Sequence, residues 1–158
     1  MSHKNTHRKS VYKHKRYWYH VSTTLKDKYV HLIPLKDGVN RSGDEPNGRR
    51  ICVSPTIEQC ITAIPYILST KLNIYRTKKR LIANHPQDIF DSNVTQEGWL
   101  QKPTSFVKVG MLKFQDVEKA LGVEHVISEA ASLSEPRVSG RVLKWWKKAK
   151  IKRLIKKA

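Results

Sequence analysis

Two short segments of this chain hold residue types that can do chemistry together. Tyr19–Ser22 contains His20, and residues 91–99 contain Glu97. The aromatic and β-branched neighbours of His20 predict a strand, whereas the polar residues before Glu97 predict a turn. An imidazole on an early strand and a lone carboxylate after a turn can hold a dinucleotide and stabilise a developing positive charge. For that chemistry, both groups must face one crevice.

The elements that position these groups follow from local patterns. Loop-forming residues fill positions 36–50, and Pro55 with the capping hydroxyl of either Thr56 or Ser54 predicts a helix start. The order of predicted elements lacks the regular alternation of a parallel doubly wound sheet, so we expect an α+β domain with a mixed or antiparallel split sheet. The predicted strands are 17–22, 30–35, 50–54, 72–76 and 106–112, and the predicted helices are 57–65 and 115–121.

Charge is concentrated at the two ends of the chain. The formal net charge is +18, with six Lys and Arg residues in positions 1–20, ten in positions 137–158 and no acidic residue in either segment. Such ends attract polyanions through counterion release. Nucleic acid is therefore the first expected partner of the ends, and an anionic membrane surface or simple solvation of the tails are the alternatives.

The charge pattern also suggests boundaries. We predict a basic disordered arm at 1–16, a single compact core at 17–123, a linker at 124–140 and a basic helix at 141–158. The apolar residues of this last helix do not keep one straight stripe, which favours docking of its Trp-containing end on protein over a membrane-surface helix. The cations expected to meet phosphates are Lys144, Lys147, Lys148, Lys150, Lys152, Arg153, Lys156 and Lys157.

Several common sites are absent from the sequence. It contains no Walker loop, no Rossmann glycine fingerprint, no zinc-protease motif and no Cys-x-x-Cys pair, and its seven His residues show no ligand spacing, so no metal is predicted. The two cysteines fit small core residues in a reducing compartment. His20-Val21-Ser22 matches half of the paired motif of small phosphoesterases, but the second copy is missing. No secretory signal or transmembrane stretch is expected.

The ordered set of short motifs resembles the ADP-ribosyltransferases, and most closely the small rifampin ADP-ribosyltransferases. In that family a strand carries Tyr-His-Gly-Thr, a strand of the type Val-Tyr-Leu-Thr precedes a helix, and an Asn-Val-Thr-Asp turn precedes a strand that ends in Val-Gly. The resemblance covers about residues 17–112. The matching segments here are Tyr19-His20-Val21-Ser22, Ile51-Cys52-Val53-Ser54, Asn93-Val94-Thr95-Gln96-Glu97 and, after Pro103, Lys108-Val109-Gly110.

The resemblance implies NAD as the cofactor and a transferase that acts on a host protein or nucleic acid. His20 would bind a ribose hydroxyl, the backbone beside it would grip the nicotinamide amide, and Glu97 would stabilise charge at the breaking glycosidic bond. The loop that includes Arg41 would meet the pyrophosphate. The implied catalytic residues are His20 and Glu97, and the implied cofactor-binding residues are His20, Val21, Ser22, Arg49, Arg50, Cys52, Ser54 and Tyr75.

An alternative interpretation is a catalytically inactive scaffold of the same fold. The family's stacking tyrosine falls on Cys52, with Tyr75 as a substitute ring, and its acid aligns with Gln96 rather than Glu97. Such a scaffold would serve as a nucleic-acid-associated protein or as a structural component of a phage virion. The expected location is accordingly the host cytoplasm or a phage particle.

Overall fold

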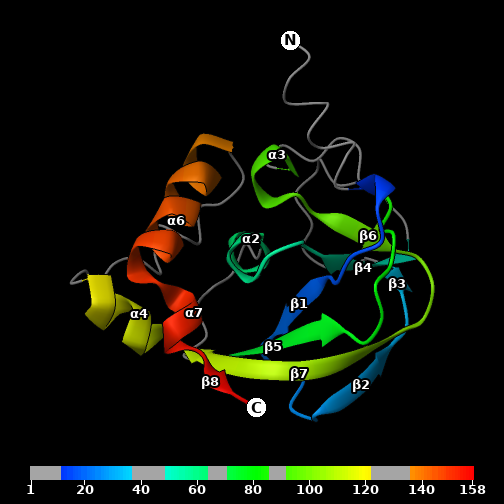
Figure 1. The fold of residues 1–158 in the computed structure, drawn as a ribbon, viewed down its shortest axis with the longest axis horizontal. Helices are drawn as coiled ribbons and strands as arrows, with labels where there is room; N and C mark the ends of the chain where they lie inside the picture. The colour runs from blue at the N-terminus through cyan, green and yellow to red at the C-terminus, as the bar shows by residue number, and fades with distance from the viewer. Residues whose placement is uncertain (1–11, 37–48, 64–70, 86–91, 122–135) are drawn as a thin grey trace.

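Two antiparallel sheets form the framework of the molecule (Figure 1). The computed structural model describes residues 12–36, 49–63, 71–85, 92–121 and 136–158. The larger sheet has the order β1-β5-β7-β2, with β8 paired to β7, and the smaller sheet has the order β3-β4-β6. The strands are β1 (Tyr19–Ser22), β2 (Tyr29–Leu32), β3 (Leu35–Lys36), β4 (Arg49–Val53), β5 (Lys71–Thr77), β6 (Gly98–Leu100), β7 (Thr104–Lys113) and β8 (Lys156–Lys157).

The helices gather on one side of the larger sheet (Figure 1). Helix α2 begins after Thr56, whose hydroxyl accepts a hydrogen bond from the backbone N–H of Gln59 and so caps the first turn. The sequence predicts this cap, and the structure confirms it. The described helices are α2 (Ile57–Thr62), α3 (Ser92–Thr95), α4 (Phe114–Leu121), α6 (Pro136–Ala149) and α7 (Ile151–Leu154).

Two hydrophobic clusters hold these layers together. The first joins α2, α4, α6 and α7 to β5 and β7, and its largest fully buried side chains are Trp146 and Phe114. The second links the smaller sheet to the other side of β5 and β7 around Trp18, Tyr75 and Phe106. The observed class is the predicted one, an α+β domain with antiparallel sheets, and no described helix is long and apolar enough to cross a membrane.

The C-terminal segment differs from the single helix predicted at 141–158. Helix α6 already begins at Pro136, inside the predicted linker. The helix is interrupted at Lys150, which has a φ of 54°. A straight helix would carry Ile151 away from the stripe of Val142, Trp146 and Ala149. The left-handed residue redirects the chain, so Ile151 is also fully buried. The apolar residues of this segment change faces along the sequence because it forms two helices, α6 and α7, rather than one.

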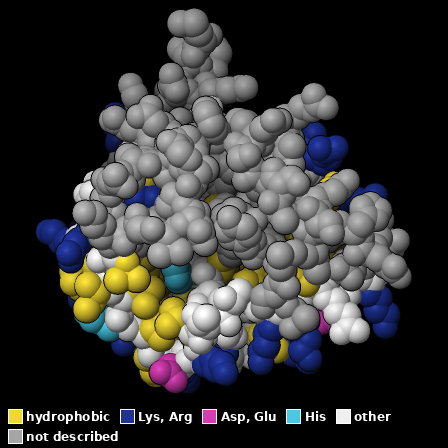
Figure 2. Space-filling model, turned by 180° about the vertical axis from the view of Figure 1, so that it is seen from behind, with side chains coloured by type: hydrophobic (Ala, Val, Ile, Leu, Met, Phe, Trp, Pro, Cys, Tyr) yellow, Lys and Arg dark blue, Asp and Glu magenta, His cyan; other side chains and the backbone are white. Residues whose placement is uncertain are grey.

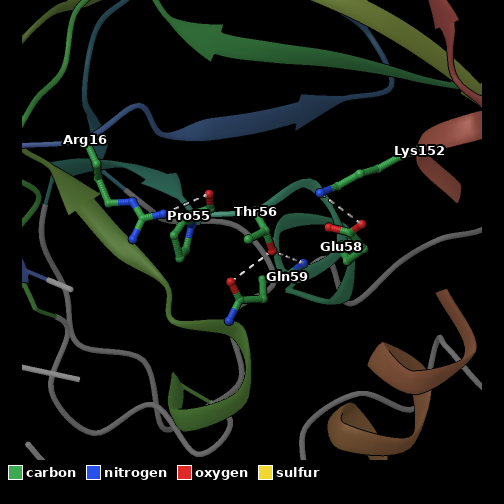
Figure 3. A network of polar contacts seen from close by, with 6 residues as sticks. All are labelled: Arg16, Pro55, Thr56, Glu58, Gln59 and Lys152. Carbon is green, nitrogen blue, oxygen red and sulfur yellow. Dashed lines mark hydrogen bonds and ion pairs between the residues drawn. The ribbon is translucent and has the colours of Figure 1, made fainter. Parts of the chain in front are cut away.

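The described residues of both end segments pack on the folded core. Tyr12 is buried in the second cluster, and Arg16 forms a bridge with Leu81, so the predicted disordered arm at 1–16 is wrong for residues 12–16. Residues 1–11 lie outside the described part. Figure 3 shows how both ends reach helix α2. Arg16 donates to the carbonyl of Pro55 at 3.5 Å, and Lys152 pairs with Glu58 at 3.7 Å.

Candidate functional site: the split between β1 and β4

Among the described residues, a backbone bridge between Tyr19 and Ser54 joins β1 to the end of β4. The N–H of Tyr19 donates to the carbonyl of Ser54 at 2.9 Å, and the N–H of Ser54 returns a bond to the carbonyl of Tyr19 at 3.0 Å. Beyond this bridge β1 pairs with β5, while β4 pairs with β6. The next residues of β1 and β4 therefore do not pair with each other, and the two strands part at this point. We call this place the split.

The imidazole of His20 occupies one side of the split. Its Nδ1 lies 2.9 Å from the carbonyl oxygen of Cys52, and its ring packs 5.7 Å from the ring of Phe106, centroid to centroid. A carbonyl only accepts hydrogen bonds, so Nδ1 carries the proton. Burial lowers the pKa of His20, and the bond to the Cys52 carbonyl opposes this effect only in part. The ring is therefore neutral, with Nε2 as a hydrogen-bond acceptor.

Cys60 of helix α2 sits against the same bridge. Its thiol donates to the carbonyl of Tyr19 at 3.2 Å, and the backbone of Ser54 and of Val21 also act on the sulfur. Burial raises the pKa of the Cys60 thiol above its ordinary range, and the negative charge of Glu97 raises it further. Cys60 is thus a neutral thiol that cannot act as a nucleophile at neutral pH.

Glu97 lies immediately before β6, at the level of the bridge. Val53 is paired with Gly98, so the next residues in the register are Ser54 and Glu97. The side chain is 8% exposed, and its charge acts on Cys60. The turn that delivers it contains Gln96 in the left-handed region, with a φ of 52°. The hydroxyl of Tyr12 donates to the backbone carbonyl of Glu97 and fixes the end of this turn.

The structure places the two predicted catalytic residues on either side of β4, with His20 on β1 and Glu97 immediately before β6. Glu97 is level with Ser54, and Ser54 is bridged to Tyr19, so two strand spacings, about 10 Å, separate the backbone of Glu97 from β1. His20 packs on Phe106 in the second cluster, whereas Glu97 acts on Cys60 at helix α2. A ligand that touches both side chains must therefore span the width of β4.

The predicted cofactor-binding residues fall into two groups. Cys52 and Ser54 line the split, and the hydroxyl of Ser54 is buried without a partner in the described part of the chain. Val21 also lies at the split, through its backbone. Ser22 is engaged elsewhere, because its hydroxyl accepts bonds from the N–H groups of Thr24 and Leu25.

Tyr75 and the two arginines take structural positions. Tyr75 is paired with His20 in the register, but its ring is fully buried and its hydroxyl donates to the carbonyl of Asp27 at 2.7 Å. It therefore offers no free face to a nicotinamide ring. The guanidinium of Arg50 lies 4.3 Å from the centroid of the Trp99 ring, and Arg49 is exposed. Arg41, from the loop expected to meet the pyrophosphate, lies outside the described residues.

The C-terminal cations expected to meet phosphates lie on the surface. All of them are exposed, while the apolar residues between them point into the first cluster. Lys152 also pairs with Glu58. No group of His, Cys, Asp and Glu residues in the described segments has the arrangement of a metal site. The exposed residues are Lys144, Lys147, Lys148, Lys150, Lys152, Arg153, Lys156 and Lys157.

Sequence reasoning missed the part that Cys60 plays at the split. Its apolar neighbours and helical spacing predict an ordinary core residue, and only the bridge between Tyr19 and Ser54 reveals which backbone groups it meets. Comparisons of the chain with protein-family models, with curated proteins and with solved structures found no match.

Proposed function

We propose that this protein is an NAD-dependent ADP-ribosyltransferase whose substrate lies along the split. The observation that carries the proposal is the adjacency of the three motif-bearing segments. The strand of His20, the strand of Cys52 and Ser54, and the turn of Glu97 follow one another as β1, β4 and β6. Segments up to about seventy residues apart in the sequence are thus brought to adjacent positions in the fold.

The groups at the split fit parts of NAD. The unprotonated Nε2 of His20 can accept a hydrogen bond from a ribose hydroxyl, because Nδ1 is held by Cys52. The buried hydroxyl of Ser54 lacks a protein partner among the described residues, and a buried polar group of this kind calls for one. The diverging backbone edges of β1 and β4 can pair with an amide, as the nicotinamide amide would require.

Glu97 is the residue proposed to act on the reacting bond. Nicotinamide departure from NAD leaves positive charge on a ribose carbon, and the acceptor group attacks that carbon. A buried carboxylate stabilises such charge strongly, because its own orientation is fixed before the reaction and little water screens it. His20 orients the ribose, and Ser54 and the backbone of Val21 hold the amide end. The exposed C-terminal cations would bring the protein to an anionic host macromolecule.

Labelled NAD tests this proposal. Wild-type protein, incubated with ³²P-NAD and a host-cell extract, is expected to transfer label to macromolecules or to hydrolyse NAD. Glu97→Gln keeps the size of the side chain and removes its charge, so the activity should fall by a factor of a hundred or more, on the order of an oxyanion-hole deletion. A matched Glu58→Gln variant, which removes a buried carboxylate on α2, should retain activity.

A second candidate function is the inactive scaffold, and two observations favour it. Cys52 replaces the stacking ring, and Tyr75 is too deeply buried to substitute for it. Cys60 also places its thiol at the bridge, where the substrate amide would bind. In this interpretation the protein is a nucleic-acid-associated or virion component that acts through its basic surface. Equal absence of NAD turnover in the wild type and both variants would favour this candidate.

A further inference from the structure

A pocket of about 590 Å³ lies between the loop after β5 and the loop that joins β6 to β7. This volume is in the range of sites that take small ligands. None of the residues proposed to hold NAD lines it. The pocket is therefore a second site, and its inference does not depend on the transferase proposal.

The charged residues that line the pocket are all basic. Lys78 and Lys79 follow β5, and Lys102 lies in the loop between β6 and β7. His31 of β2 also lines the pocket. The three lysines are exposed, and no carboxylate is present among the described lining residues. Figure 2 shows the molecule from behind, and acidic side chains are few among the residues described on that side. Charge complementarity thus points to an anion.

Part of the pocket wall is apolar. Ile82 is 53% exposed, and Trp99 and Pro103 also line the pocket. An ordinary phosphate ion would gain nothing from these walls. A ligand that combines a planar apolar part with phosphate groups satisfies both the walls and the lysines, and a nucleotide unit has this composition.

A second apolar surface continues from the pocket. Lys78 lines the pocket and also lies 4.8 Å from the centroid of the Tyr29 ring, and Lys28 lies 5.5 Å from the same centroid. Tyr29 is 57% exposed. Cations and apolar surfaces therefore alternate along this face, the pattern with which proteins bind the phosphates and bases of a single strand. A single nucleotide in the pocket would not contact Tyr29, whereas a longer strand would.

We propose that this face binds single-stranded nucleic acid, with one base in the pocket and the neighbouring phosphates on Lys78, Lys79 and Lys102. The site is rigid, since its parts are joined by backbone hydrogen bonds. The N–H of Lys78 donates to the carbonyl of Ser105 at 3.1 Å, and Asn84 and Trp99 exchange bonds at 2.9 and 3.0 Å. The bound strand needs no rearrangement of the fold.

Fluorescence anisotropy with the full chain and a labelled oligothymidylate of about twelve nucleotides tests the proposal. The double variant Lys79→Gln/Lys102→Gln should bind about tenfold more weakly at low salt. It should also lower the slope of log K against log salt by about 1.4, the value for two phosphate contacts to a single strand. Ile82→Ser should weaken binding with an unchanged slope, because it removes apolar contact and no charge.

The matched control is Lys113→Gln/Lys119→Gln, which removes the same charge from exposed positions near α4. It should change affinity by less than twofold. Equal losses in both double variants would show general attraction to a cationic protein and overturn the site. Tighter binding of a duplex of the same length, or displacement of the strand by polyglutamate at equal charge concentration, would overturn it in favour of a different polyanion. Circular dichroism of each variant confirms that it is folded.

Discussion

The Nδ1 of His20 donates a hydrogen bond to the backbone carbonyl of Cys52 at the point where β1 and β4 part. The side chain of His20 thus makes the hydrogen bond to β4 that a backbone group of β1 would make if the ladder continued. This bond fixes the imidazole tautomer, satisfies a carbonyl that the ladder leaves open, and directs Nε2 away from Cys52. Both the stability of the split and its proposed chemistry depend on it.

The lowered pKa of His20 predicts a stability that depends on pH. The folded-state pKa lies below the ordinary value of 6.5, so the unfolded chain binds a proton more readily. The contribution of neutral His20 to the free energy of unfolding is complete above about pH 6.5. It is lost as the pH falls from there toward the folded-state pKa. Urea unfolding at several pH values measures this effect. Between pH 6.5 and 5, His20→Gln should lose less stability than the wild type. The same dependence of unfolding free energy on pH in both proteins would contradict the lowered pKa of His20.

The raised pKa of Cys60 predicts an unreactive thiol. In the folded protein at pH 8, Cys60 should resist alkylation by iodoacetamide, and it should react once urea unfolds the chain. Burial is the larger cause of the shift, so Glu97→Gln should leave this protection in place. Mass spectrometry of alkylated peptides distinguishes Cys60 from the partly exposed Cys52. Rapid labelling of Cys60 in the native protein would mean that the thiol is not held at the bridge.

Gly98, next to Glu97, is required by close packing. A Cβ at this position would lie 2.7 Å from the Cβ of Ala83 and 3.0 Å from the ring of Trp18. Neither neighbour has room to move, because both are buried in the second cluster. Gly98→Ala should therefore destabilise the protein by about 1–3 kcal/mol, measured by urea unfolding. A stability equal to that of the wild type would show that Gly98 is packed less tightly against Ala83 and Trp18 than the structure indicates.

The contribution of the C-terminal cations to polyanion binding must be tested by substitution, because helix α6 has to remain in the protein. Trp146 is fully buried, so truncation of α6 removes core packing, and Trp146→Ala alone should cost about 3–5 kcal/mol. The exposed triple variant Lys144→Gln/Lys147→Gln/Lys148→Gln should keep the unfolding midpoint of the wild type. It should lower the affinity for heparin and the salt dependence of that binding. An unchanged salt slope would remove these residues from the polyanion surface.

Local patterns predicted much of the fold. The cap at Thr56, the strand of His20 and the α+β class follow from composition and spacing, because these features depend on neighbouring residues. The redirection at Lys150 could not be predicted in the same way. It depends on the position of the core under Trp146 and Ile151, and nothing in the residue type of a lysine signals a left-handed conformation.

The candidate site was predicted only in outline. The sequence indicates His20 and Glu97, and it places their strands in an order that allows them to meet. It does not show that His20 turns toward Phe106 while Glu97 lies beside Cys60, because side-chain direction at the split depends on where the ladder between β1 and β4 stops. That point is set by long-range pairing, for which a single sequence carries no local signal.

The most direct test of the account follows the ring nitrogens of His20 by NMR while NAD is added. With ¹⁵N-labelled histidine, the account predicts a protonated Nδ1 that stays on the Cys52 carbonyl and a saturable shift of the Nε2 resonance. Glu97→Gln should retain this binding shift and lose turnover. An Nε2 resonance that stays fixed at millimolar NAD, in a wild-type protein shown to be folded, would contradict binding at the split.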